Sequence, residues 1–141
     1  NIGSEYLLEG IDENGEIKPE ASAQVMAGLK NHFRPEFLNR LDEIIMFKPL
    51  DKASISGIVN LLLADLNKRI ADKELTLKLT DAAMDHVIEA GYDPHYGARP
   101  LKRYLQKNVE TLVAKSILSN ELRAGDTITL DYDGNALYIK K

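Results

Sequence analysis

The spacing of the apolar residues changes sharply within residues 51–79, and this change constrains the fold more than any other feature. Over residues 51–71 the apolar side chains recur every three or four positions, which is the period of an amphipathic helix. They are Ile55, Ile58, Val59, Leu62, Leu66 and Ile70. Over residues 75–79 leucines alternate with polar residues, which predicts a half-buried strand. The domain must therefore combine helices with a sheet.

The rest of the C-terminal part continues this alternation. Thr80 or Asp81 is expected to cap a helix that runs to about Ala90 and is closed by Gly91. A loop over residues 92–97 leads into a helix near 98–118, whose apolar stripe is Leu101, Leu105, Val109, Leu112, Val113 and Ile117. Strands over 127–130 and 136–139 flank Asp133-Gly134, which predicts a hairpin. We expect an α+β domain of three helices and a small three-stranded sheet.

The first 49 residues follow a different pattern. Residues 1–20 are polar, with a turn signal at residues 12–15, and helices are expected over about 20–32 and 35–41. Residues 43–47 carry a continuous apolar run before Pro49, which is typical of a buried strand in a parallel sheet. Since residues 1–42 offer no obvious partner strand, we expect the sheet to lie upstream of this chain. The domain boundary is expected near Pro49-Leu50.

The composition is that of an ordinary globular domain and argues against several classes of protein. Of the 141 residues, 44% are hydrophobic and 28% are charged, which suffices for a sizeable core. The net charge of −4 argues against nucleic acid as the main partner. We also expect no membrane span, since no apolar run approaches about 18 residues. Cysteine is absent, and the chain starts at Asn1 with no basic region followed by an apolar one, so we expect no signal peptide and a cytoplasmic fragment of a longer protein.

Basic residues crowd the start of the helix expected near residues 98–118. Arg99, Lys102 and Arg103 surround Pro100, which suits a first helical turn. Cations at this end of a helix cost roughly 0.3–1 kcal/mol each when exposed, because they oppose the helix dipole. Free backbone N–H groups there favour anions instead. The segment is therefore either a phosphate-binding site or a solvated basic face paired with nearby acids.

Arg40 lies on the second short helix expected in the first 49 residues. Phe37 and Leu41 are four positions apart and face one way, so Arg40 projects outward. Its planar, always charged guanidinium suits contact with a phosphate of a neighbouring subunit. The alternative is an ordinary ion pair with Glu36 or Asp42.

Two segments together resemble the Clp family of AAA+ unfoldases. They are Phe-Arg-Pro-Glu-Phe-Leu-Asn-Arg-Leu-Asp-Glu, residues 33–43, and Gly-Tyr-Asp-Pro-x-Tyr-Gly-Ala-Arg-Pro-Leu-Lys-Arg, residues 91–103. They occur in the family's order and separation, and the resemblance runs through essentially the whole chain. It looks most like the second ATPase module of the ClpB disaggregases, with the ClpC and ClpE types as close alternatives. The resemblance implies an AAA+ small (lid) subdomain over residues 50–141, preceded over residues 1–49 by a remnant of the α/β large subdomain.

The resemblance implies roles for three residues. Asn1 matches sensor 1, a polar residue near the γ-phosphate and the attacking water. Arg40 matches the arginine finger, which acts in trans on the ATP of the neighbouring subunit. Arg99 matches sensor 2, which contacts the γ-phosphate of its own subunit.

The resemblance also implies the cofactors and partners. The cofactors are ATP and Mg²⁺, and the assembly is a homohexamer that acts on unfolded or aggregated proteins together with an Hsp70-type co-chaperone. An unfoldase that feeds a partner protease and a stand-alone interaction module are the alternatives.

Some parts of an ATPase are missing from the sequence. It contains no Gly-x-x-x-x-Gly-Lys-Ser/Thr phosphate loop and no apolar run ending in paired acids that could place magnesium. His32, His86 and His95 lack the spacing of metal ligands. We therefore expect the chain to supply accessory catalytic residues, to hold no metal ligand and to be inactive alone.

Overall fold

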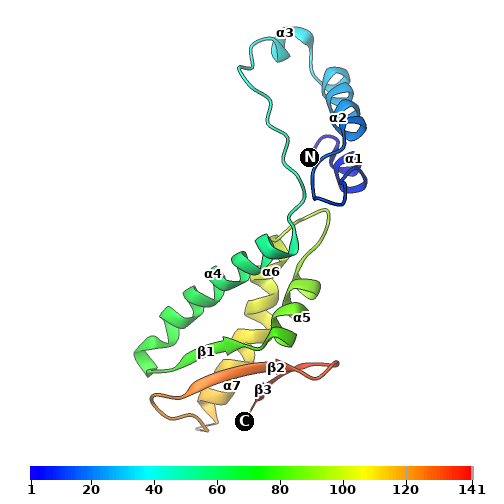
Figure 1. Cartoon of the computed structure of the whole chain (residues 1–141). Coiled ribbons are helices and arrows are strands. Elements are labelled where there is room, and N and C mark those ends of the chain that lie inside the picture. The colour runs from blue at the N-terminus through cyan, green and yellow to red at the C-terminus, as the bar shows by residue number, and fades with distance from the viewer. Residues whose placement is uncertain (120, 141) are drawn as a thin grey trace. The chain divides into compact units, whose positions relative to one another are not determined.

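The computed structural model describes residues 1–119 and 121–140 of the chain (Figure 1). The chain forms two compact units, Asn1–Asp51 and Lys52–Lys141. The first unit contains α1 (Ser4–Glu9), α2 (Pro19–His32) and α3 (Pro35–Leu38). The second contains α4 (Lys52–Ile70), the 3-10 turn η1 (Ala71–Lys73), β1 (Thr76–Leu79), α5 (Asp81–Gly91), α6 (Arg99–Tyr104), the π-helical η2 (Leu105–Glu110), α7 (Thr111–Leu118), β2 (Thr127–Tyr132) and β3 (Leu137–Lys140).

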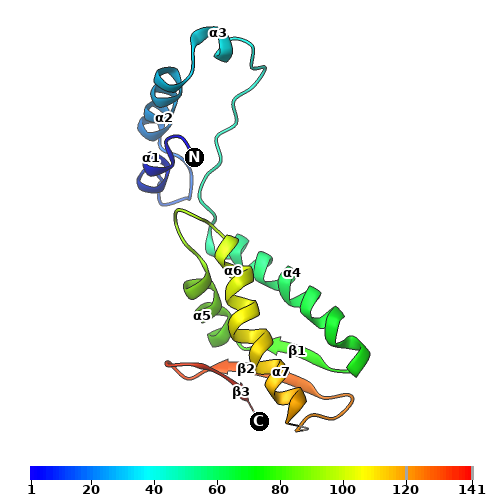
Figure 2. The ribbon, with the colours of Figure 1, turned by 180° about the vertical axis from the view of Figure 1, so that it is seen from behind.

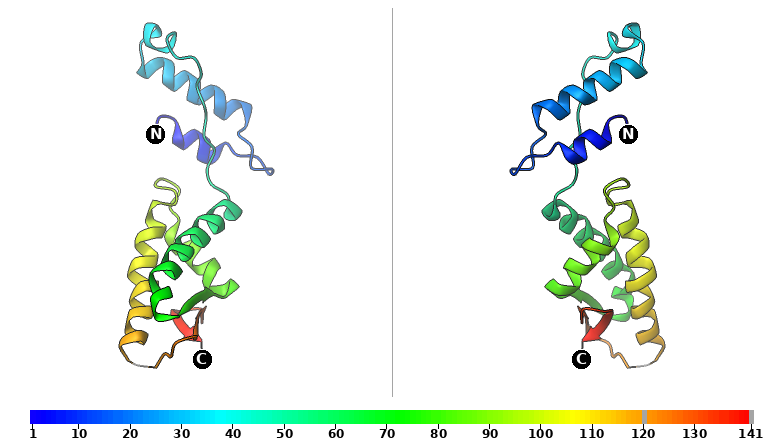
Figure 3. Two further views of the ribbon diagram at one scale, coloured as in Figure 1. Left: turned by 90° about the vertical axis from the view of Figure 1, so that its left-hand side faces the viewer. Right: turned by 90° about the vertical axis from the view of Figure 1, so that its right-hand side faces the viewer.

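The second unit has the α+β fold that the hydrophobic pattern predicts. Its sheet has the order β1-β2-β3, with β1 parallel to β2 and β2 antiparallel to β3. Figure 3 shows this sheet at one end of the unit, with α4 and α5 above it. Leu77, Ile128 and Leu130 are buried, whereas Thr76 and Lys78 are exposed, so one face of the sheet packs on the helices.

One apolar core joins the helices of the second unit to the sheet. Every predicted stripe residue of α4 and of the α6–α7 helix is buried in this core or packs partly buried against it. The buried members are Ile55, Val59, Leu63, Leu66, Leu75, Leu77, Val87, Ile88, Leu101, Leu105, Val109, Val113, Ile128 and Leu130. The stripes predicted from the sequence therefore identify most of the core residues of these helices, but they did not include Leu63, Val87 and Ile88.

The long helix predicted near residues 98–118 is present, but its middle turns are π-helical. Figure 2 shows α6, η2 and α7 as one continuous helical rod. Within η2 the side chain of Asn108 donates a hydrogen bond to the carbonyl of Tyr104 at 3.0 Å. The apolar period stays close to that of an α-helix through this widening, so the pattern alone does not reveal it.

In the first unit, the predictions of α2 and of the turn near residue 12 are confirmed. Oδ1 of Asp12 accepts hydrogen bonds from the backbone N–H groups of Asn14 and Glu16, both at 2.9 Å. The helix expected over 35–41 is shorter, because α3 ends at Leu38. Helix α1 was not predicted, because its six residues are too few to show a period.

Residues 43–47, predicted as a strand of a sheet that lies upstream, form no strand within this chain. These residues are extended but unpaired, and the side chains of Ile45 and Phe47 are 67% and 81% exposed. A strand requires a neighbouring strand to satisfy its backbone N–H and C=O groups. The described residues of the first unit contain no strand that could serve as this neighbour.

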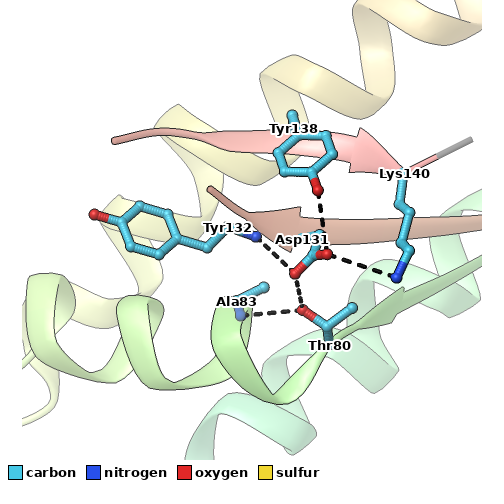
Figure 4. A network of polar contacts seen from close by, with 6 residues as sticks. All are labelled: Thr80, Ala83, Asp131, Tyr132, Tyr138 and Lys140. Atoms are coloured by element: carbon cyan, nitrogen blue, oxygen red, sulfur yellow. Dashed lines mark hydrogen bonds and ion pairs between the residues drawn. The ribbon is translucent and has the colours of Figure 1, made fainter. Parts of the chain in front are cut away.

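A network around Asp131 ties the start of α5 to β2 and β3 (Figure 4). Oδ1 of Asp131 accepts hydrogen bonds from the Thr80 hydroxyl at 2.6 Å and from the backbone N–H of Tyr132 at 2.9 Å. Oδ2 accepts one from the Tyr138 hydroxyl at 3.2 Å, and Nζ of Lys140 lies 3.8 Å away. The Thr80 hydroxyl also accepts from the backbone N–H of Ala83 and so caps α5.

Replacing Asp131 with asparagine should lower the melting temperature at neutral pH, and the loss should shrink on acidification. The hydrogen bond from Thr80, then that from the backbone of Tyr132, holds the pKa of Asp131 below its usual value. A carboxyl with a lowered pKa stabilises the fold above its unfolded pKa of about 3.9, and this stabilisation is lost as the pH falls through the folded pKa. Thermal melts of both proteins between pH 7 and pH 3 would measure this. A difference that is constant or grows on acidification would contradict the prediction.

Candidate functional site: the base-rich start of helix α6

The loop before α6 is closed by its own hydrogen bonds. Asp93 and Gly97 exchange backbone hydrogen bonds, with N–O distances of 3.1 and 2.6 Å. Oδ1 of Asp93 also accepts from the backbone N–H groups of His95 and Tyr96, at 2.7 and 3.0 Å. Gly97 has a φ of 63°, a left-handed conformation that glycine adopts without strain. The Tyr-Asp-Pro-x-Tyr-Gly segment therefore forms a tight loop that ends where α6 begins.

Arg99 is the first residue of α6 and is exposed. Pro100 occupies the first turn, as the sequence predicts, and Lys102 and Arg103 follow on exposed positions. Among the residues that the structure describes, no carboxylate lies within 4.0 Å of any of these three basic groups. The ion-paired basic face considered above is therefore not formed, and three cations remain free to meet an anion.

The packing of α6 on α5 fixes the helix just after Arg99. Leu101 is fully buried, and its side chain lies against Gly91 at the end of α5. A Cβ placed on Gly91 would lie only 2.5 Å from Cδ2 of Leu101. The sequence predicted Gly91 as a helix-closing glycine. Instead it is the last helical residue, it lacks a left-handed φ, and it allows α5 and α6 to approach closely.

Arg40 is exposed just beyond α3, and its backbone N–H donates a hydrogen bond to the carbonyl of Phe37. Within the described parts of the chain, it forms no ion pair with Glu36 or Asp42. Phe37 stacks on Phe33 with ring centroids 5.0 Å apart, which stiffens the turn that carries Arg40. The guanidinium is therefore free to contact an external group.

Asn1 is exposed and lines a groove of about 440 Å³ within the first unit. The other lining residues are mostly apolar and come from the α1 and α2 region and from the extended segment, namely Ile2, Ser4, Leu7, Val25, Leu29, Ile44, Ile45, Met46 and Phe47. Arg40 does not line this groove. The structure thus does not bring Asn1 and Arg40 into one pocket, and Arg99 belongs to the second unit.

Sequence reasoning missed Asp93, whose hydrogen bonds organise the loop before Arg99. Its signal was available, because an aspartate two or three residues before backbone N–H groups that need a partner is typical of a turn.

Of the histidines, His86 is structural, since it bonds the Tyr104 hydroxyl at 2.8 Å and stacks on Tyr132. Within residues 1–119 and 121–140, no three His, Cys, Asp or Glu side chains cluster in a way that could hold a metal ion. Likewise, none of the helices described here has both the length and the apolar character to cross a membrane.

Helices α4, α5 and α6–α7 around a small mixed sheet, with free basic residues at the start of α6, define a small subdomain of the AAA+ type. Residues 50–130 match the family model described as the C-terminal, D2-small domain, of ClpB protein. The chain therefore belongs to this family, and the ClpC and ClpE alternatives are not favoured.

Individual relatives agree with this assignment. The chain is 50% identical over 139 residues to chaperone protein ClpB of Bacillus anthracis, covering 99% of this chain and 16% of that protein. It is 50% identical over 137 residues to chaperone protein ClpB of Nitratidesulfovibrio vulgaris, covering 97% of this chain and 16% of that protein. The structure of the S. cerevisiae Hsp104-ADP complex matches with a TM-score of 0.81 and 33% identity, covering 96% of this chain and 23% of that one. This chain thus spans only 16% of the length of these curated relatives.

Proposed function

We propose that this chain is the nucleotide-responsive end of an ATP-driven protein disaggregase, and that Arg99 is its sensor of the γ-phosphate. The observation that carries this proposal is the cluster of three unpaired bases at the start of α6, in a chain of the ClpB D2-small family. A triphosphate would offset their mutual repulsion and their unfavourable place near the positive end of a helix. ATP would supply the free energy of hydrolysis, and Arg99 would link the presence of the γ-phosphate to the position of the second unit.

Arg40 and Asn1 would complete the catalytic set from the first unit. The exposed guanidinium of Arg40 would neutralise charge that develops on the phosphate of a neighbouring subunit. The amide of Asn1 would orient the attacking water near the γ-phosphate. Arg40 would act across subunits, so hydrolysis would require a ring. Because this chain resembles the second of two ATPase modules, the full-length protein would form two rings, and Arg40, Asn1 and Arg99 would act in the second ring.

Several features of the full-length protein follow from this proposal. Residues 1–49 would belong to an AAA+ large subdomain and residues 50–141 to the small subdomain. The exposed apolar side chains of Ile45 and Phe47 would be covered by a sheet from upstream sequence. Since the phosphate loop and the magnesium ligands would also lie upstream, this chain alone would hydrolyse no ATP.

The relatives support a chaperone that binds nucleotide. The Bacillus anthracis relative is a chaperone protein, and the Hsp104 structure is a complex with ADP. We propose a cytoplasmic homohexamer that requires Mg²⁺, acts on unfolded or aggregated proteins and works with an Hsp70-type co-chaperone.

Replacing Arg99 with alanine in the full-length protein should weaken ATP affinity about tenfold, which is the loss of one charge-assisted contact. The 141-residue chain with the same change should keep its fold, because the Arg99 side chain contacts no acid among the described residues. Nucleotide titration measures the first effect and thermal melting the second.

The matched control for Arg99 is Arg123→Ala, which removes an exposed arginine from the loop between α7 and β2. It should leave ATP affinity unchanged. If Arg99→Ala instead lowers the melting temperature by more than about 8 °C, roughly 2 kcal/mol at this length, Arg99 is mainly structural.

A further inference from the structure

We infer that Asp93 is a positioning residue for Arg99, because its hydrogen bonds close the loop that sets where α6 begins. The inference rests on the proposed function of Arg99 and extends it to a residue that would touch no nucleotide. Asp93 would act by fixing the backbone from which the Arg99 side chain projects.

The loop has little besides hydrogen bonds to hold its shape. The side chains of Pro94, His95 and Tyr96 are exposed, and Tyr96 is 68% exposed, so apolar packing contributes little there. By contrast, Oδ1 of Asp93 accepts hydrogen bonds from the backbone N–H groups of His95 and Tyr96. The backbone N–H and C=O of Asp93 also both form hydrogen bonds with the backbone of Gly97. Removing the Asp93 carboxylate would therefore release the main constraint on residues 94–96.

Arg99 lies between this loop and the packed part of α6. Its backbone N–H donates to the carbonyl of Tyr96 at 3.4 Å, so its position follows that of the loop. Before Arg99, Ala98 packs against the core only in part, and the first fully buried residue after the loop is Leu101. Ala98, which precedes Arg99, offers no side-chain cap. A loosened loop would let the first turn of α6 fray, and the backbone that carries the Arg99 guanidinium would no longer be held in one position.

Binding of a phosphate by a long side chain depends on the position of the backbone that carries it. A guanidinium must meet phosphate oxygens within hydrogen-bond distance and in its own plane. A displacement of about 1 Å at a positioning residue can cost a large part of such an interaction. The carboxylate charge of Asp93 is not required, because an amide oxygen can accept the same two hydrogen bonds.

The chain contains a closely matched control for Asp93. Oδ1 of Asp133 accepts hydrogen bonds from the backbone N–H groups of Asn135 and Ala136, both at 2.8 Å, in the hairpin between β2 and β3. Asp133→Ala therefore removes the same kind of turn from the same unit at a place that does not lead into α6.

The experiment measures the affinity of the full-length protein for a fluorescent ATP analogue and for ADP, with the first ring made unable to bind nucleotide. Asp93→Ala should weaken binding of the ATP analogue about three- to tenfold, as expected for the loss of one or two hydrogen bonds. Binding of ADP should change less than about twofold, since ADP lacks the phosphate that Arg99 would contact. Asp93→Asn should bind like the unmodified protein, and so should Asp133→Ala. In an Arg99→Ala background, Asp93→Ala should have no further effect, because the two residues would act as one unit.

The outcomes separate this inference from the proposed function. If Arg99→Ala itself leaves ATP binding unchanged, the proposed function and this inference both fail. If Arg99→Ala weakens binding but Asp93→Ala does not, only the inference fails. Only the inference fails, too, if Asp93→Asn is as damaging as Asp93→Ala, if Asp133→Ala has the same effect, or if the losses at Asp93 and Arg99 add.

A second pair of variants covers the case in which Asp93→Ala does not fold. Gly97 and Gly134 both have positive φ, 63° and 91°, and a Cβ on either would meet no atom within 4 Å. Alanine at each position therefore strains the backbone without a clash. Gly97→Ala should weaken binding of the ATP analogue about two- to threefold, which is a smaller loss of binding free energy than the one that corresponds to a tenfold change in affinity. Gly134→Ala should not weaken it, and equal effects of the two would overturn the inference.

Discussion

Replacing Arg40 with alanine in the full-length protein is expected to lower ATP hydrolysis in the second ring about a thousandfold, the lower end of the range for arginine fingers. Affinity for ATP should change much less, because a finger stabilises charge that develops only in the transition state. The exposed, unpaired guanidinium beyond α3 has no visible structural task among the described residues. Turnover measured with the first ring silenced would give this number.

A mixing experiment tests whether Arg40 acts across subunits. One protein carries Arg40→Ala, and the other lacks a working phosphate loop in the same ring, so each is poorly active alone. Mixed rings should recover activity, because an intact phosphate loop in one subunit then meets an intact Arg40 from its neighbour. Subunit exchange must be confirmed separately by fluorescence transfer. Exchange without recovered activity at any mixing ratio would place Arg40 in its own subunit or in a structural role.

Replacing Leu101 with alanine is expected to destabilise the 141-residue chain by about 3 kcal/mol, within the range for a buried leucine in a close-packed core. Leu101 is fully buried at the contact between α5 and α6, where Gly91 already brings the backbones close together. The helices cannot approach further to fill the space, so a cavity should remain. The melting temperature should fall by about 12 °C at this chain length.

Leu61 provides the control for this substitution. It lies on α4 and is 71% exposed, so Leu61→Ala makes the same chemical change where little apolar surface is buried. This variant should stay within about 0.5 kcal/mol of the unmodified chain. A loss of less than about 1 kcal/mol for Leu101→Ala would mean that α5 and α6 can repack, against the close contact at Gly91.

The second unit could be predicted from the sequence because its core lies within its own segment. The stripes of α4 and α6–α7 and the alternation of β1 each match one period, so helices, strands and core residues were confirmed. The parallel pairing of β1 with β2 was not predicted, since it joins distant segments that no local pattern relates. The strand predicted at residues 43–47 is not formed within this chain for the opposite reason. Its local pattern is strong, but no described strand of the first unit pairs with it.

The candidate site was predictable to a different degree. The conflict between basic side chains and the start of a helix singled out the cluster of Arg99, Lys102 and Arg103 from physical reasoning, and the structure shows that nearby acids do not resolve it. The roles of Asn1, Arg40 and Arg99 came from family resemblance and stay predictions. Asp93 was missed although an aspartate in such a segment is typical of a turn, because its carboxylate binds backbone N–H groups rather than a ligand.

The parallel pairing of β1 and β2 has a consequence for the order of folding. Thr76 pairs with Thr127, so the whole of α5, α6, η2 and α7 must be made before the two strands can meet. Bringing the two ends of so long a connection together costs chain entropy before any contact between the strands can stabilise the fold. Such contacts therefore form late and slowly. While the chain is being synthesised, β1 remains without its partner strand until β2 has been made. Helices α4 and α5 can assemble earlier, but the sheet begins to form only after β2 has left the ribosome, and β3 completes it.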